Sequence, residues 1–503
     1  MYLANTAALR FNKTSPFSKT KESNKGKFTL SRLVSATSWT TLATVVNLLL
    51  TMAQLAVLVR IITPSVFGQF AVVNMVIEVF VAFALGGISN FLVYKKNADQ
   101  PTSNAIYFLA LGIGGIFTLV LFLLTPFLAT ALGYESIVQE LRLATVLLVI
   151  SSLASQYQAV GMKNFHHQRV AQVDIIAKIL SFIFAISFSH LDLLCLVGAI
   201  VIYQLVRLVG FMIVLGKEVN LSTKVNTSIY REAFNYGIFD FGSQALNIVR
   251  RQLDVIILAV TLPSSELGVY HVIKQLASRP AQALQPIIGK VALPAFAEVK
   301  EDQTRFARVY KDFFILQLFV LAIIYIPVII TSDLVTELFF GPDFVQHSWV
   351  LSILAVFWFV RVASSNLVGP LVQATGYTKR NFLWNVILIL PNTLVIYASS
   401  QYGVVSLVLA MTVFQLILFP IVNYYFILFI TKVSFSFSLR NMVIVVLSLA
   451  APLSILKYSI LPLIPEIFLV KEVVVALLTF AVAAMLLVFF KELKSSLIRV
   501  KGF

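Results

Sequence analysis

The sequence predicts an all-α membrane protein with fourteen transmembrane helices. Of its 503 residues, 59% are hydrophobic and only 12% are charged, whereas a soluble domain is about 45–50% apolar and about one quarter charged. Apolar runs long enough to cross a bilayer recur along nearly the whole chain. Each run must be helical, because lipid offers no partner to unpaired backbone groups. The composition excludes a soluble globular enzyme and a disordered chain, and the single Cys195 excludes an intrachain disulfide.

The apolar runs give the expected helices in chain order. Two of them, 171–189 and 267–297, are unusually polar, because the former carries Asp174 and Lys178 and the latter carries several basic residues and prolines. The runs cover residues 38–60, 68–93, 105–131, 141–161, 171–189, 191–215, 235–261, 267–297, 313–331, 347–371, 381–399, 403–430, 441–463 and 468–490.

The placement of charge tests this order of helices. The chain has 38 Lys and Arg against 22 Asp and Glu, a net charge of +16, which in a soluble protein would suggest nucleic acid. Here 26 of the 38 basic residues fall in the two tails and in every second connection, and only Lys457 and Lys471 fall in the others. Basic connections stay in the cytoplasm. We therefore expect a multi-pass protein of the bacterial inner membrane with both termini cytoplasmic, and no nucleic-acid partner.

A repeat at an offset of 200 residues divides the chain. The turn Pro64–Gly68 matches Ser264–Gly268, and a polar helical face precedes each turn. The first face comprises Thr40, Thr44, Asn47, Thr51 and Gln54, and the second comprises Asp240, Gln244, Asn247, Arg251 and Asp254. An even number of spans per copy leaves both copies in the same orientation, so they should be related by an axis along the membrane normal, with a site between them.

This repeat predicts two six-helix lobes and two extra helices. The expected segments are a basic cytoplasmic tail without regular structure at 1–33, lobes at 34–216 and 228–430, two added helices at 437–490 and a cytoplasmic tail at 491–503. No connection exceeds about 20 residues, and no Gly-rich phosphate loop, HExxH motif or CxxC pair is present. A transporter is therefore favoured over an enzyme, and we expect no cofactor and no metal site.

Charges inside the spans mark the candidate site, because buried charges are costly and by default face a cavity or a partner. Most of them are cations of the second half, with too few carboxylates to neutralise them. Arg250 and Asp254 have the i,i+4 spacing of an internal ion pair. We expect Asp240, Asp254 and Glu78 to balance charge or couple transport. The predicted substrate-binding residues are Arg250, Arg251, Lys274, Arg279, Lys290, Arg361, Gln244, Asn247, Gln275, Gln282, Asn47 and Gln54.

These residue types indicate the class of ligand. The planar fork of arginine suits phosphate, and a run of amides and hydroxyls along 267–297 suits sugar hydroxyls. An uncompensated group of cations at membrane depth therefore favours an anionic substrate. A purely structural role, in which all these charges pair with one another, is the competing interpretation.

Several short segments of the chain resemble the polysaccharide exporters of bacteria, the Wzx-type flippases. Leu58-Val59-Arg60-Ile61-Ile62-Thr63-Pro64 with Phe67-Gly68 is similar to the segment that ends their first helix. Leu293-Pro294-Ala295-Phe296-Ala297, Phe340-Gly341-Pro342 and Gln373-Ala374-Thr375-Gly376 are similarly placed. The resemblance covers most of 31–430, is strongest for the colanic-acid-exporter branch, and places the chain in the multidrug/oligosaccharidyl-lipid/polysaccharide (MOP) superfamily.

The resemblance implies that the protein flips an undecaprenyl-pyrophosphate-linked oligosaccharide across the inner membrane for lipopolysaccharide or exopolysaccharide assembly. Membrane lipids and other polysaccharide assembly proteins would be its partners. A cation-coupled multidrug antiporter would prefer an acidic cavity, and the first helix carries no carboxylate. A peptidoglycan-precursor flippase would differ only in cargo, and a glycan polymerase would need longer loops.

Overall fold

The computed structural model describes residues 19–85, 100–164, 166–219, 230 and 248–460. Within these ranges the regular structure is helical, with short 3-10 and π turns and no strand. The predicted span at 468–490 and the first 13 residues of that at 235–261 lie outside the described residues, whereas 248–261 is helical.

The helices follow the predicted order. They are α1 (Lys19–Val59), α2 (Pro64–Leu85), α4 (Gln100–Leu132), α5 (Val138–Lys163), α6 (His167–Ser187), α7 (Leu193–Val219), α9 (Ser264–Val299), α10 (Gln303–Ile330), α11 (Ser332–Phe340), α12 (Ser348–Ser365), α13 (Val368–Thr375), α14 (Thr378–Ser400), α15 (Gly403–Val422), α16 (Phe429–Thr431) and α17 (Phe435–Ile455).

Eleven helices in the described part of the chain are long and apolar enough to cross a membrane. They correspond to eleven of the fourteen predicted runs. The predicted run at 267–297 is also helical, as α9, but it is not among the eleven, because its glutamines, prolines and charged residues make it less apolar. The helix α1 begins at Lys19, within the segment predicted as an unstructured tail, while its apolar span starts at Trp39.

Local sequence explains where several helices begin and end. The side chain of Asp302 accepts hydrogen bonds from the backbone N–H groups of Thr304 and Arg305, both at 3.0 Å, and so caps the start of α10. Gly376 ends α13 in the left-handed conformation with φ of 79°, which costs glycine little because it lacks a Cβ.

The outer faces of the bundle are apolar. On α4, Ile116, Leu123 and Phe127 are 62%, 66% and 69% exposed. Such a surface is unfavourable in water and is expected where lipid tails are the solvent. Together with the eleven apolar helices, it identifies a multi-span membrane protein.

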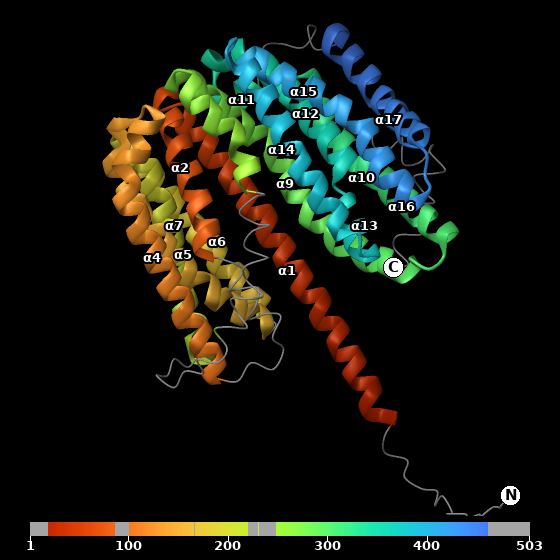
Figure 1. The fold of residues 1–503 in the computed structure, drawn as a ribbon, viewed down its shortest axis with the longest axis horizontal. Helices are drawn as coiled ribbons and strands as arrows, with labels where there is room; N and C mark the ends of the chain where they lie inside the picture. The colour runs from red at the N-terminus through yellow and green to blue at the C-terminus, as the bar shows by residue number, and fades with distance from the viewer. Residues whose placement is uncertain (1–18, 86–99, 165, 220–229, 231–247, 461–503) are drawn as a thin grey trace, which may run out of the picture.

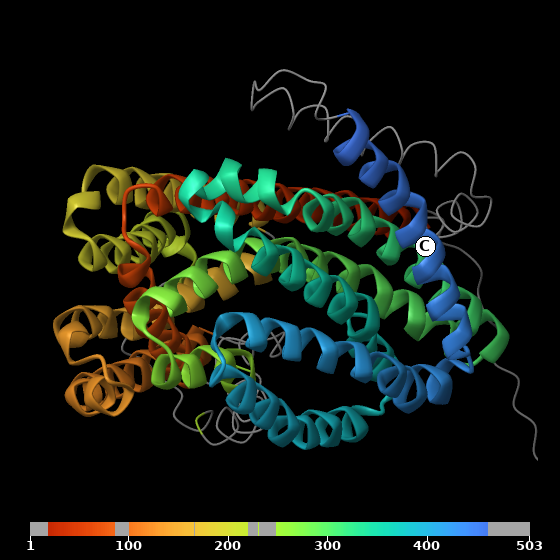
Figure 2. The ribbon, with the colours of Figure 1, turned by 90° about the horizontal axis from the view of Figure 1, so that it is seen from above.

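The helices gather in two groups with α1 and α9 between them. Figure 1 shows α4, α5, α6 and α7 on one side and α10, α12, α14 and α15 on the other. The helix α1 packs against both α6 and α9, and α2 packs along α9. Seen from above, α17 lies at the edge of the described bundle, where it packs against α10 (Figure 2).

The contact between α2 and α9 is reciprocal. A Cβ at Gly68 would overlap the backbone carbonyl of Ser264, and a Cβ at Gly268 would overlap that of Pro64. The hydroxyls of Ser65 and Ser264 share a 2.8 Å hydrogen bond. Only glycine permits this approach of two backbones. The contact joins the two turns that the offset of 200 residues matches.

Two basic residues join other elements at the same end of α2 and α9. Arg60, which follows α1, donates from its Nη2 to the carbonyl oxygens of Glu337 at 3.3 Å and Leu338 at 2.6 Å, near the end of α11. A cation is favourable at the carbonyl end of a helix. Lys457, beyond α17, donates to the carbonyl of Ile330 at 2.7 Å. These bonds hold α1 and the segment after α17 against the α10–α11 region.

Candidate substrate site

Three arginines form a group of cations within the bundle. Arg250 and Arg251 lie in the helical segment 248–261, and Arg361 lies on α12. Arg361 is within electrostatic range of both Arg250 and Arg251. Its guanidinium lies over the rings of Phe357 and Trp358, at 5.6 and 5.1 Å from their centroids. We call Arg250, Arg251 and Arg361 the arginine cluster.

Within the described residues, no member of the arginine cluster forms a salt bridge. Cation–π contacts stabilise a guanidinium through its flat face. They leave the N–H groups, which lie in the plane of the guanidinium, available for hydrogen bonds. Within the described part of the chain the guanidinium of Arg361 has no hydrogen-bond partner, and Arg251 is exposed. Three neighbouring positive charges repel one another, and an anion with several oxygens would relieve that repulsion.

Asp254 is paired with a residue of another helix. Its carboxylate accepts hydrogen bonds from the ammonium of Lys274 and the hydroxyl of Tyr270, both at 2.5 Å. The backbone N–H of Val255 also donates to it, at 2.9 Å. The internal pair predicted between Arg250 and Asp254 is therefore wrong. Tertiary packing brings α9 against the carboxylate, so Lys274 takes the place that the i,i+4 spacing assigned to the arginine.

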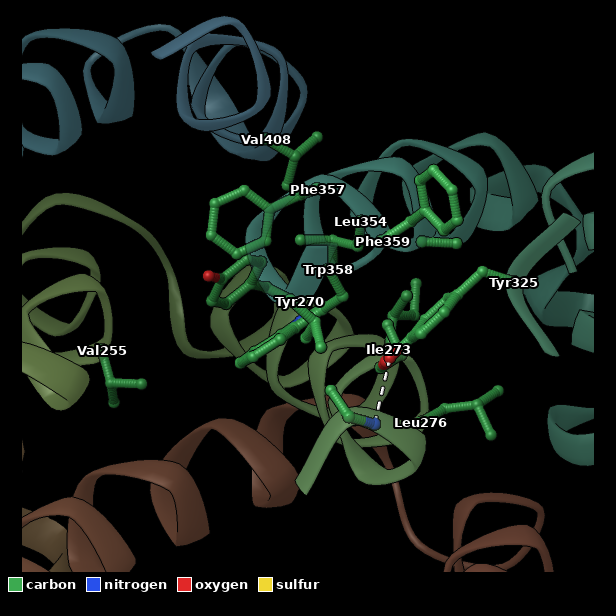
Figure 3. Close-up of a cluster of buried hydrophobic side chains, with 14 of the residues drawn as sticks. Val255, Tyr270, Ile273, Leu276, Tyr325, Leu354, Phe357, Trp358, Phe359 and Val408 are labelled. Atoms are coloured by element: carbon green, nitrogen blue, oxygen red, sulfur yellow. Dashed lines mark hydrogen bonds between the residues drawn. The ribbon is translucent and has the colours of Figure 1, made fainter. Parts of the chain in front are cut away.

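An aromatic core lies beside this ion pair. Figure 3 shows Tyr270 of α9 grouped with Phe357 and Trp358 of α12, and Val255 apart from them on its own segment. Tyr325 of α10 lies near, where its hydroxyl accepts from the backbone N–H of Ala281 at 3.2 Å. Tyr270 is fully buried. This packing fixes the ring whose hydroxyl holds Asp254.

The polar side chains of α9 bond to one another along the helix. Gln275 lies 2.7 Å from the Nε2 of His271 through its side-chain nitrogen, and its Oε1 accepts from Arg279 at 2.7 Å. Gln282 donates to the hydroxyl of Ser278 at 3.1 Å. The Nε of Arg279 is buried with no hydrogen-bond partner. The predicted polar face of this helix is therefore present, and it retains an unused donor.

Lys178 of α6 belongs to the same region, although the sequence interpretation did not include it among the site residues. Its ammonium donates to the Oε1 of Gln54 on α1 at 2.7 Å. It is also within electrostatic range of Arg279. The available signal was a lysine in a mostly apolar run, which marked 171–189 as unusual but not as functional.

Glu78 is held by amides. Its carboxylate accepts from Asn74 at 3.0 Å and from Gln252 at 2.5 Å, and it is within electrostatic range of Arg279. Gln252 belongs to 248–261. This bond therefore connects α2 to the segment that carries the arginine cluster.

The remaining predicted residues have different positions. The Oδ1 of Asn47 on α1 is buried without a partner, whereas Asp240, Gln244 and Asn247 lie outside the described residues. Lys290 is exposed on α9 and within electrostatic range of His167. It lies sixteen residues from Lys274, about 24 Å along a helix at 1.5 Å per residue. Lys290 therefore lies apart from Lys274, and its role in substrate binding stays a prediction.

Arg207 has a structural role. It donates to Asp174 at 2.6 Å and to the side chains of Gln204 and Gln158 at 3.0 and 3.1 Å. This partly buried cation is neutralised by Asp174, and each of its three guanidinium nitrogens donates a hydrogen bond. The arginine cluster differs, because its members have no salt bridge to a described residue.

Comparisons with known proteins identify the family. The family model described as "Polysaccharide biosynthesis protein" matches residues 57–349. The chain is 27% identical to the amylovoran biosynthesis protein AmsL of Erwinia amylovora, over 60% of this chain and 78% of that protein. It is 22% identical to the lipopolysaccharide biosynthesis protein WzxC of Escherichia coli (strain K12), over 77% of this chain and 79% of that protein.

A solved structure shares the fold. The lipid II flippase MurJ in an inward closed conformation superposes with a TM-score of 0.69, covers 92% of this chain and 99% of its own, and is 11% identical. The resemblance to polysaccharide exporters inferred from short segments is thus confirmed. The chain belongs to the polysaccharide biosynthesis protein family and shares its helical fold with the lipid II flippase MurJ.

Proposed function

We propose that this protein flips an oligosaccharide linked to undecaprenyl pyrophosphate across the bacterial inner membrane by alternating access. The arginine cluster binds the pyrophosphate, the polar face of α9 contacts the glycan, and the lipid tail stays in the bilayer. The family and the shared fold support this function, and the side-chain contacts of the arginine cluster and of α9 support the proposed residue roles. No enzyme activity is part of the proposal.

The arginine cluster is the observation that carries the proposal. Its three guanidiniums come from two elements and have no salt-bridge partner within the described ranges. Lys274, by contrast, is neutralised by Asp254 at 2.5 Å. Two adjacent phosphates offer several acceptor oxygens to paired N–H donors, which is the geometry that guanidinium binds best.

The amides of α9 suit the sugar part of the substrate. Gln275 and Gln282 lie on the same helix as the cation that neutralises Asp254, and their side-chain nitrogens bond to His271 and Ser278 on that helix. Hydroxyl groups of a glycan can replace such bonds with little net change in free energy, because one neutral hydrogen bond is exchanged for another. A face of this kind tolerates a moving, polar cargo.

The α2–α9 contact supports alternating access between two lobes. Residue pairs 200 apart in sequence contact each other reciprocally at Gly68 with Ser264 and at Gly268 with Pro64, as expected when a two-fold axis passes between equivalent elements. We assign lobes at 34–216 and 228–430, with a hinge or gate where α2 and α9 cross. Opening would separate these two backbones.

The membrane potential favours the outward direction. The cell interior is negative, so an outward-moving anion gains about 2.3 kcal/mol per charge per 100 mV. The basic tails and alternate connections predict that both termini lie in the cytoplasm. In the proposed outward step the membrane potential therefore supplies part of the driving force.

The experiment uses the full chain in proteoliposomes with a lipid-linked oligosaccharide labelled on its sugar and a potassium-diffusion potential. We expect flipping by the wild type and at least a tenfold loss for Arg251→Ala and Arg361→Ala. Lys300→Gln is the matched control, because Lys300 is 48% exposed beyond α9. Flipping that is unchanged in the Arg251→Ala/Arg361→Ala double variant would refute the cluster's role.

The same vesicles test the alternatives. Efflux of ethidium without movement of the oligosaccharide would replace the proposal by a drug antiporter. Equal or better flipping of the peptidoglycan precursor would reassign the cargo to that pathway.

A further inference from the structure

A basic and aromatic cluster lies where α14 begins and where the chain continues after α15. The guanidinium carbon of Arg380, in the first turn of α14, lies 4.0 Å from the ring centroid of Tyr425 and 3.9 Å from that of Phe429. Tyr425 belongs to the π-helical turn that follows α15, and Phe429 begins α16. At such distances a guanidinium packs against the face of a ring, and this contact does not use its N–H groups. We call Arg380 and Lys432, with the rings of Trp384, Tyr425 and Phe429, the basic clamp.

Further contacts hold the basic clamp together. The ring of Trp384 stacks on that of Tyr425, with centroids 5.2 Å apart and planes at 25°. The ammonium of Lys432 lies 5.7 Å from the centroid of Phe429, the ring that Arg380 contacts at 3.9 Å. Because both cations contact one ring, their charges are at most about 10 Å apart. A phosphate group between them can therefore accept hydrogen bonds from both.

The sequence that forms the basic clamp contains no carboxylate. No Asp or Glu occurs between Asp343 and Glu466, whereas Lys379, Arg380 and Lys432 lie within that stretch. Lys379 and Arg380 also occupy the first turn of α14, where the helix dipole is positive and a cation is unfavourable. An anion at this position is therefore favoured by the side chains and by the end of the helix.

The turn between α9 and α10 lies beside the basic clamp, because Gln303 donates to the carbonyl of Ile430 at 3.2 Å. This turn carries carboxylates that have other partners. Asp302 accepts hydrogen bonds from the backbone at the start of α10, and the exposed Glu301 lies 3.9 Å from the ammonium of Lys300. Within the described part of the chain, no carboxylate forms a salt bridge with the basic clamp.

The basic clamp lies at the edge of the lipid-facing surface. Phe382, Ile387 and Leu390 follow Arg380 along α14 and are exposed, as expected where lipid tails surround a helix. Trp and Tyr side chains concentrate at the level of the lipid headgroups, and the clamp contains one of each. The basic residues at this end predict that it faces the cytoplasmic leaflet. The clamp therefore lies at the height where the phosphates of that leaflet are expected.

An apolar groove lies deeper in the membrane on the same two helices. It has a volume of about 420 Å³, and its lining includes Val395 of α14 and Leu409, Val413 and Ile417 of α15. Ile417 is eight residues from Tyr425, which is about 12 Å along a helix. One leaflet contributes about 15 Å to the hydrocarbon core. A lipid whose headgroup lies at the basic clamp can therefore place an acyl chain in the near end of the groove.

We propose that the basic clamp and this groove bind one anionic phospholipid. Its phosphate accepts hydrogen bonds from Arg380 and Lys432, and one acyl chain lies in the groove between α14 and α15. An anionic lipid is favoured over a zwitterionic one, because each basic residue near the membrane surface attracts the former. The site goes beyond the proposed function, since it lies outside the arginine cluster and takes a lipid of the membrane rather than the transported one.

The test uses the full chain in detergent micelles and two lipids with brominated acyl chains, phosphatidylglycerol and phosphatidylcholine. Bromine quenches the fluorescence of a nearby tryptophan, and the signal of Trp384 is the difference between the wild type and Trp384→Phe. We expect half-maximal quenching of Trp384 at about tenfold less phosphatidylglycerol than phosphatidylcholine, the preference that one to two basic residues give.

Three variants locate this preference. Arg380→Gln and Lys432→Gln should each lower it by about fivefold, because each removes one basic residue near the membrane surface. Arg440→Gln is the matched control, since Arg440 is exposed on α17 at the same predicted side of the membrane, and it should leave the preference unchanged. Melting temperatures show whether Arg380→Gln is folded, and Lys432 is exposed, so Lys432→Gln tests the site even where Arg380→Gln is unstable.

Two results would refute the site. Equal quenching of the wild type by both lipids would show that the basic clamp is neutralised within the protein, and an equal loss of preference in Arg440→Gln would show an effect of general surface charge. Competition then tests the occupant. Unbrominated phosphatidylglycerol should relieve the quenching, whereas inorganic pyrophosphate at the same concentration should not. Relief by inorganic pyrophosphate, or by polyprenyl pyrophosphate at far lower concentration than phosphatidylglycerol, would assign the clamp to a free anion or to the transported lipid and overturn the proposal.

Discussion

Gly68→Ala tests the close crossing of α2 and α9. The added Cβ would overlap the backbone carbonyl of Ser264, and a backbone atom cannot rotate away as a side chain can. Overpacking typically costs about 1–3 kcal/mol. The reciprocal contact of Gly268 with Pro64 predicts that Gly268→Ala has a similar effect. The control is Gly115→Ala on α4, where a Cβ meets nothing within 4 Å.

The control isolates the clash. Alanine is favoured over glycine inside a helix by about 0.5–1 kcal/mol, and this gain applies to both positions, so it cancels in the difference. For 503 residues, a difference of about 1–3 kcal/mol corresponds to a melting temperature lower by about 2–5 °C, scaled from smaller domains. Differential scanning fluorimetry of the purified proteins measures it. Equal melting temperatures for Gly68→Ala and Gly115→Ala would show that the two backbones do not approach as described.

Three further predictions follow from the contacts. The hydroxyls of Ser65 and Ser264 are 2.8 Å apart, so the double variant Ser65→Cys/Ser264→Cys should form a disulfide under oxidation. This cross-link should stop flipping until it is reduced. Continued flipping by the cross-linked protein would exclude opening at this contact. Asp254→Asn should destabilise the protein by about 3–5 kcal/mol, because Lys274 then keeps a charge without its partner. Adding Lys274→Met should restore most of the melting temperature. A double variant that is no more stable than Asp254→Asn would contradict the pairing. Arg207→Met should lower the melting temperature without changing flipping per folded molecule, since its bonds are internal, and a selective loss of flipping would give it a role in binding.

Most of the fold could be predicted because hydrophobicity and length act locally. Bilayer thickness requires about 20 apolar residues per helix, and the observed helices reproduce eleven of the predicted runs. The helix α9 was predicted in spite of its charges, because its polar residues fall on one face. The extension of α1 back to Lys19 was not foreseen, because the apolar pattern ends near residue 38.

The candidate site was predictable in composition but not in pairing. The excess of cations in the second half is visible in the sequence, whereas Lys178 was missed because, with Asp174, it was taken only as a sign of an unusually polar run. The predicted Arg250–Asp254 ion pair is not formed, although the i,i+4 spacing puts both residues on one face of a helix. The spacing does not show that Lys274 of another helix competes with Arg250 for the carboxylate. Lys290 shares α9 with Lys274 but lies too far along the axis to join its group.

The sequence by itself determined that this is a helical membrane protein with a repeat at an offset of 200 residues and an excess of basic residues within its spans. Those properties depend on the number, order and spacing of residue types along the chain, so they can be read without knowing which helices pack together. Only the tertiary structure decided which charges are neutralised and which remain. Asp254 bonds to Lys274 and Arg207 bonds to Asp174, whereas the arginine cluster has no salt bridge to any residue that the structure describes. Electrostatic pairing acts over a few ångströms between different helices, so it is set by packing rather than by sequence separation.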